Sequence, residues 1–397
     1  MKRAIFPLTL VLISCFIAAV ANGPLDANEP LEQKPIGERL TAPLVDISGD
    51  VDRQVVIAQG TNDIYQGHPY SLMMPDGKTI WVVWNINHGG YAGPLARSCD
   101  GGLTWTRLDD QLPEEVKGYK NCPSIFRLVN AEGEAFLWIF AAQPLIPRVV
   151  KKDVPDAPWE VAPALGYPNV MAFSTIIPEH PGVQDGCYLA FYHRAITDGG
   201  KVMNDESEQT RTLEVMMCRT GDAGFTWSEP ETVASVPGKD PCEPCAFWSP
   251  AGDEICCLMR ENTHKSASLM MFSTDNGKTW SDPVDTSPEL TGDRHIGTRL
   301  SDGRYFFAFR DTAAGSPTVG HFVGWIGTYD DIKNAAPGQC RIKLLHSYAG
   351  WDCGYPGVHQ LADGTVVALT YIKYRPGEEK HSVVETRFLP DEVAPLE

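Results

Sequence analysis

The chain has 397 residues, of which 43% are hydrophobic and 10% aromatic, and its formal net charge is −18. This composition is that of a soluble globular protein with a large core, and it excludes a disordered chain, a collagen-like chain and a multi-span membrane protein. The negative charge disfavours nucleic acid and anionic membranes as partners, although a local cluster of arginines can still attract a small anion.

The N-terminus is organised like an export signal. Two basic residues precede an apolar run over residues 4–20, and Ala19 and Ala21 supply small residues at the two positions that a signal peptidase reads. We expect residues 1–21 to be a signal peptide that is removed from a secreted or periplasmic protein. A transmembrane anchor and a lipoprotein signal that attaches lipid to Cys15 are the alternatives. We expect no integral membrane domain in the rest of the chain.

The chain has 11 cysteines, and loss of Cys15 with the signal peptide leaves 10. An even number in an exported protein permits disulfides, whose pairing the sequence does not reveal. A zinc site is suggested by Cys242 and Cys245 together with Cys256 and Cys257. Adjacent residues of a strand point to opposite faces, however, so this pattern favours disulfides or buried thiols. We expect neither a metal nor another cofactor.

One sequence unit occurs six times: a turn, usually Asp-Gly, followed by an apolar run rich in β-branched and aromatic residues. The runs cover residues 80–84, 136–140, 188–192, 255–259, 305–309 and 366–369. The turns lie 50 to 67 residues apart, which suits a four-stranded sheet. Because the runs are apolar on both faces, each should lie in the middle of its sheet. Six small sheets that cannot bury their own faces predict an all-β, six-bladed β-propeller.

We place this propeller at residues 45–390, after an N-terminal extension over 22–44 and before a tail over 391–397. A second motif, [Ser/Thr]-x-Asp-x-Gly-x-Thr-Trp, occurs within it three times, at residues 98–105, 220–227 and 273–280. Its Asp is expected to accept backbone N–H bonds within the turn, its Gly to adopt a positive φ, and its Trp to pack under the hairpin. Three copies indicate a folding device rather than a catalytic site.

This motif matches the Asp-box or BNR repeat, and over residues 45–390 the chain resembles the sialidase/neuraminidase superfamily. The resemblance implies a six-bladed propeller with its active site at one mouth of the central channel. In that superfamily three arginines bind the sugar carboxylate, a tyrosine attacks the anomeric carbon, a glutamate takes the tyrosine proton, and an aspartate is the acid/base. Guanidinium groups match a carboxylate, and a neutral tyrosine is not repelled by an anionic centre.

Four residues match the superfamily's functional segments. Glu243, in Cys-Glu-Pro, and Arg260, at the end of the next apolar run, resemble its glutamate and second arginine. Tyr355, in Gly-Tyr-Pro-Gly, resembles the nucleophile, and Arg310 resembles the third arginine. The resemblance thus implies that Tyr355 and Glu243 are catalytic and that the two arginines bind substrate.

Two segments depart from the superfamily pattern. Residues 66–70 lack the first arginine, and the loop 85–93 lacks the acid/base aspartate. His68 and His88 occupy these places, and a histidine can act as a general acid or donate to a sugar hydroxyl. We predict that His88 is the acid/base and that His68 binds substrate; loop histidines with structural bonds are the alternative. His321, in the loop after the third arginine, is predicted as a further binding residue.

The resemblance implies an exported glycoside hydrolase that acts on a terminal sugar of a glycan or glycoconjugate, with an acidic sugar favoured. The alternative is a non-catalytic, carbohydrate-binding propeller that has lost part of the site, because a fold does not determine function.

Overall fold

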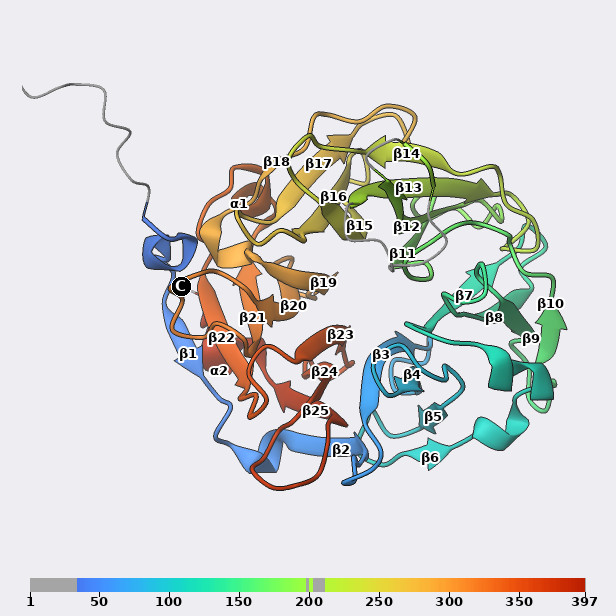
Figure 1. Cartoon of the computed structure of the whole chain (residues 1–397), viewed down its shortest axis with the longest axis horizontal. Coiled ribbons are helices and arrows are strands. Elements are labelled where there is room, and N and C mark those ends of the chain that lie inside the picture. Colours follow the sequence, from blue (N-terminus) through green and yellow to red (C-terminus); the bar gives the residue numbers. More distant parts are fainter. Residues whose placement is uncertain (1–33, 198–199, 203–210, 397) are drawn as a thin grey trace, which may run out of the picture. The chain divides into compact units, whose positions relative to one another are not determined.

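Six small sheets follow one another around a ring (Figure 1). The computed structural model describes residues 34–197, 200–202 and 211–396, and all of these from Pro35 onward belong to one compact unit. The predicted all-β, six-bladed propeller is confirmed. The predicted signal peptide, with Cys15, lies outside the described residues. No helix of the described part of the chain is long and apolar enough to cross a membrane.

The strands of the first three blades follow the chain. Blade 1 contains β3 (Gln66–Met73), β4 (Ile80–Ile86), β5 (Leu95–Ser98) and β6 (Thr106–Arg107). Blade 2 contains β7 (Ser124–Val129), β8 (Ala135–Phe140), β9 (Arg148–Lys152) and β10 (Glu160–Ala162). Blade 3 contains β11 (Thr175–Pro178), β12 (Tyr188–Thr197), β13 (Arg211–Thr220) and β14 (Glu231–Ala234).

The strands of blade 4 also follow the chain, whereas blades 5 and 6 each include one strand from the N-terminal part of the chain. Blade 4 contains β15 (Pro241–Trp248), β16 (Ile255–Glu261), β17 (Leu269–Ser273) and β18 (Val284–Asp285). Blade 5 contains β19 (Gly292–Arg299), β20 (Tyr305–Asp311), β21 (Phe322–Gly327), β22 (Cys340–Leu345) and, parallel to β22, β1 (Leu44–Asp46). Blade 6 contains β23 (Cys353–Gln360), β24 (Val366–Ile372), β25 (Ser382–Phe388) and β2 (Gln54–Ala58).

Helices are short. The α-helices of the described region are α1 (Tyr329–Lys333) and α2 (Pro390–Val393). The 3₁₀ turns are η1 (Ile36–Arg39), η2 (Val51–Arg53), η3 (Asp109–Gln111), η4 (Glu114–Gly118) and η5 (Pro288–Leu290).

The six apolar runs found in the sequence are the second strands of the blades, β4, β8, β12, β16, β20 and β24. Each is paired on both edges and almost fully buried, as predicted from its two apolar faces. Their side chains fill core clusters between neighbouring blades. Cys257 belongs to the cluster between blades 3 and 4 and Cys256 to the one between blades 4 and 5, so these adjacent cysteines do point to opposite faces.

The three repeated turns have the predicted geometry. In the first, Asp100 Oδ1 accepts from Thr104 N at 2.9 Å, Gly102 has a φ of 96°, and Trp105 Nε1 donates to the Gly102 carbonyl at 2.8 Å. The other two turns repeat these bonds at their own Asp, Gly and Trp. The motif therefore closes a hairpin between the third and fourth strands of blades 1, 3 and 4.

A buried glutamate joins the first of these turns to blade 6. Glu385, on β25, is fully buried against Gly102, where a Cβ would lie 2.6 Å from its Oε2. Its Oε1 accepts from Arg387 at 2.9 Å, and Arg387 also donates to the Gly101 carbonyl at 2.7 Å. Burial raises the pKa of Glu385 from 4.5 to about 8, and Arg387 opposes this only in part.

This raised pKa predicts a loss of stability on the alkaline side of pH 4.5. In that window the unfolded chain has released the Glu385 proton while the native state still holds it, so the free energy of unfolding falls as pH rises towards 8. One proton sets a limiting slope of about 1.4 kcal/mol per pH unit. Urea unfolding of wild type and Glu385→Gln at pH 5 and pH 8 should show the variant gaining relative stability at pH 8. An equal difference at both pH values would contradict the prediction.

Candidate functional site

Four innermost strands begin with a β-bulge that presents one side chain to the centre of the ring. The bulges lie after Gly67 in β3, Cys242 in β15, Asp293 in β19 and Gly354 in β23. The residues placed there are His68, Glu243, Arg294 and Tyr355, and all four have a positive φ, between 43° and 58°. Non-glycine residues adopt this conformation at a cost, and such strain gathers at functional sites. The fold thus uses the same β-bulge four times to direct different side chains to the centre of the ring, which we call the hub.

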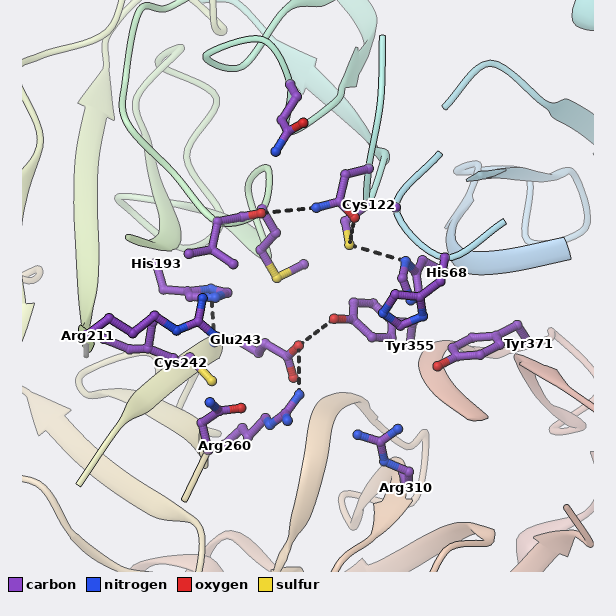
Figure 2. Close-up of a pocket in the computed structure, with 18 residues that line it drawn as sticks. His68, Cys122, His193, Arg211, Cys242, Glu243, Arg260, Arg310, Tyr355 and Tyr371 are labelled. Carbon is purple, nitrogen blue, oxygen red and sulfur yellow. Dashed lines mark hydrogen bonds and ion pairs between the residues drawn. The ribbon is translucent and has the colours of Figure 1, made fainter. Parts of the chain in front are cut away.

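The hub contains a cavity of about 450 Å³ (Figure 2). Six of the seven predicted site residues line it: His68, His88, Glu243, Arg260, Arg310 and Tyr355. They come from blades 1, 4, 5 and 6. His321 is not among the lining residues; its ring centre lies 4.2 Å from that of His346, with the rings tilted, and its Nδ1 accepts from Ser347 N at 3.2 Å.

The shortest contact among these residues joins Tyr355 and Glu243. Tyr355 Oη donates to Glu243 Oε1 at 2.6 Å. Burial and then the charge of Glu243 raise the pKa of Tyr355 well above its ordinary value. Although burial alone would raise the pKa of Glu243, Arg260 and Arg294 hold it below its ordinary value. At neutral pH the pair therefore consists of a protonated tyrosine and an ionised glutamate, which is a nucleophile beside its base.

Two of the predicted arginines share a buried aspartate. Arg260 Nε lies 2.9 Å from Asp293 Oδ1, and its Nη1 lies 3.3 Å from Glu243 Oε1. Arg310 Nε donates to Asp293 Oδ2 at 3.2 Å, and its Nη1 donates to the Trp351 carbonyl at 2.6 Å. Burial opposes ionisation of Asp293, but the two arginines lower its pKa below the usual range. Asp293 therefore fixes both guanidinium groups and offsets part of their charge.

Further cationic residues lie near the hub, and no sequence motif predicted them as site residues. Arg211, at the start of β13, lines the cavity together with His193 from β12. Arg294 is buried: its Nη1 donates to Ser174 Oγ at 2.7 Å, and its guanidinium lies 5.4 Å from the centre of the Tyr355 ring. A cation over that ring favours negative charge on the tyrosine oxygen.

Histidines and a cysteine form the wall beside the tyrosine. The His68 ring lies 4.3 Å from the Tyr355 ring and 4.4 Å from the ring of His88, which is exposed. Cys122, which precedes β7, also lines the cavity and contacts His68. On the opposite wall His193 Nδ1 accepts from Glu243 N at 3.3 Å, and burial is the main cause that lowers its pKa to about 3. His193 is thus a neutral acceptor that holds the Glu243 backbone.

One sequence signal would have found Cys122. His68, Cys122, Glu243 and Tyr355 are each followed by proline, and each has a positive φ near the start of an innermost strand. A dipeptide X-Pro ahead of an innermost strand therefore marks a hub residue in four of the six blades. Arg294 has no such proline.

No cluster of three or more histidine, cysteine, aspartate or glutamate side chains in the described region is arranged to hold a metal ion. The ten cysteines described are all thiols, and most of them lie in the core.

Comparisons with known proteins concern the fold. No protein-family model matches the chain, and no curated protein matches it. A protein of unknown function from Dyadobacter fermentans DSM 18053 is 17% identical, with a TM-score of 0.59, over 84% of this chain and 97% of its own. An α-L-arabinofuranosidase from Fusarium graminearum, in complex with an iminosugar inhibitor, is 12% identical, with a TM-score of 0.55, over 86% of this chain and 98% of its own.

A Hadza microbial sialidase is 13% identical, with a TM-score of 0.53, over 86% of this chain and 69% of its own. These likenesses establish the architecture: the chain has a sialidase-like, six-bladed propeller fold.

Proposed function

We propose that the chain is an exo-acting glycoside hydrolase in which Tyr355 is the nucleophile. The observation that carries the proposal is the 2.6 Å hydrogen bond from Tyr355 Oη to Glu243 Oε1, in a cavity large enough for a sugar. The similarity in fold to a sialidase and an arabinofuranosidase supports a glycoside as the substrate.

The reaction would proceed in two steps. Tyr355 Oη attacks the anomeric carbon and its proton passes to Glu243, while the bond to the leaving oxygen breaks and His88 donates a proton to that oxygen. Water then attacks the same carbon and gives a proton to His88, the bond to Tyr355 Oη breaks and the sugar is released, and Glu243 returns its proton to the tyrosine. Arg294, over the tyrosine ring, favours the transient negative charge on its oxygen.

The arginines of the cavity support an acidic sugar as the substrate. Arg260 and Arg310 line it and Arg294 lies over the Tyr355 ring, so three guanidinium groups face the two carboxylates of Glu243 and Asp293. A positive cavity in a chain of net charge −18 favours an anionic ligand locally. We further propose that the apolar N-terminus exports the chain to meet its glycan outside the cell.

A carbohydrate-binding protein without turnover is the second candidate. Glu243 is the only carboxylate among the described residues that line the cavity, and Asp293 already engages Arg260 and Arg310. Both facts favour a site that holds a sugar without cleaving it.

A panel of glycosides distinguishes these candidates. The purified chain is incubated with α-sialosides, uronides and α-L-arabinofuranosides, and released sugar is measured by chromatography. We expect release from at least one acidic glycoside. Release from arabinofuranosides alone would show that the substrate is a neutral sugar and would contradict the proposed acidic substrate. Binding of a panel member without any release would establish the second candidate and contradict the hydrolase.

A further inference from the structure

The wall of the cavity between blades 1 and 2 carries a thiol that the proposed hydrolysis does not use. Cys122 Sγ lies 3.5 Å from His68 Nδ1, within hydrogen-bond range for sulfur, and it donates to Asn121 Oδ1 at 3.0 Å (Figure 2). Cys122 is 5% exposed and lines the cavity, so a small molecule that enters the hub can reach its sulfur.

An amide lies on the other side of the same imidazole. Asn85, near the end of β4, is fully buried, and its side-chain hydrogen bonding to His68 favours the protonated ring. His68 Nε2 and Asn85 Oδ1 are both buried, and neither atom has a hydrogen-bond partner among the described residues. With Nδ1 facing sulfur and Nε2 left for the amide, the order is thiol, imidazole, amide. Catalytic hydrogen bonds are often loose in proteins without ligand and tighten when one binds.

We propose that Cys122, His68 and Asn85 form a nucleophilic thiol centre in the hub, and that Cys122 is a site of covalent modification by small carbon electrophiles. A cysteine, a histidine that takes its proton and an amide that orients the histidine make up a known arrangement for activating sulfur. Asn85 is here a positioning residue, because it acts through His68.

The positive charge of the hub favours an anionic sulfur over a charged imidazole. Burial, followed by the charges of His88, Arg310 and Arg294, holds the pKa of His68 well below its ordinary value, so the resting ring is neutral and is a weaker base than a free imidazole. The positive charges of Arg310 and Arg294, which disfavour a charged imidazole, attract an anionic sulfur beside it.

The thiol is coupled to the proposed nucleophile of sugar cleavage. Tyr355 packs against the small core cluster that contains Cys122, and both residues line the cavity. An adduct on Cys122 would therefore occupy the space in front of Tyr355. This consequence for sugar cleavage rests on the proposed function, whereas the reactivity of the thiol does not.

The test is alkylation by iodoacetamide at pH 7, followed by peptide mass mapping over time. The Cys122 sulfur forms a bond to the methylene carbon, iodide leaves, and the thiol proton passes to His68. Cys99, which is exposed on the first repeated turn, is the internal reference. Since an ordinary thiol is only a few per cent ionised at pH 7, we expect Cys122 to react at least about 10-fold faster than Cys99, although it is far less exposed.

Two variants connect the rate to the neighbours of the thiol. His68→Gln should slow alkylation of Cys122 at least about 10-fold and leave that of Cys99 unchanged, and Asn85→Ala should slow it less. Circular dichroism shows which variants are folded. Where a variant does not fold, the alkylation rates of Cys122 and Cys99 in the wild-type protein still test whether Cys122 is activated. Alkylation of Cys122 no faster than that of Cys99, or an unchanged rate in folded His68→Gln, would overturn the proposal. Neither readout needs a glycoside.

Discussion

Replacing Tyr355 by phenylalanine should lower kcat/KM for the glycoside that is cleaved by at least about 100-fold, while KM changes little. The substitution removes only the oxygen that donates to Glu243 Oε1 at 2.6 Å. The ring that packs against His68 and lies under Arg294 is retained, so the cavity keeps its shape. The measurement is initial rates of sugar release over a range of substrate concentrations.

Tyr348→Phe is the matched control, because that tyrosine is 49% exposed and is not a lining residue of the hub cavity. We expect its kcat/KM to equal that of wild type. If Tyr355→Phe retained more than about a tenth of the wild-type rate, Tyr355 would not be the nucleophile, since general base or nucleophile loss costs more than this.

Replacing Asp293 by asparagine should be the most destabilising single change at the hub. Asp293 is 2% exposed and pairs with Arg260 and Arg310, whose side chains are 15% and 13% exposed. Removal of one member of a buried charge cluster leaves the others uncompensated, at a cost of about 3–5 kcal/mol. Urea unfolding at pH 7 should show this loss as a lower midpoint with an unchanged slope.

Asp285→Asn provides the comparison, because Asp285 pairs with Lys239 at the surface and its side chain is 52% exposed. Such exposed pairs contribute about 0–1 kcal/mol. If the two variants unfolded at the same urea concentration, the buried aspartate would not be holding the arginines in place.

The fold could be predicted from the sequence because its dominant signal is local. Each second strand is a short run that is apolar on both faces and follows a turn, and this pattern depends on no other part of the chain. The three Asp-box turns likewise fix their own hydrogen bonds. Six copies of a local unit therefore reveal the number of blades.

The site could be predicted only in part, because it depends on which side chains meet across the ring. Glu243 and Tyr355 were found through their segments, and the structure brings them within a hydrogen bond. Asp293 was missed, since nothing in the sequence shows that a strand-start carboxylate will lie between arginines from two other strands. The position of His321 outside the cavity wall has the same origin, because its place in the loop after Arg310 does not determine where the ring points.

The way the ring closes has a consequence for the order of biosynthesis. The outermost strand of blade 6 is β2, near the N-terminus, and it pairs with β25, with Gln54 opposite Thr386. β2 leaves the ribosome long before β25, so the two strands can pair only after β25 has been synthesised. Until then β2 has a bare edge, which other chains could capture. A nascent chain therefore depends on β25 to close the ring of blades.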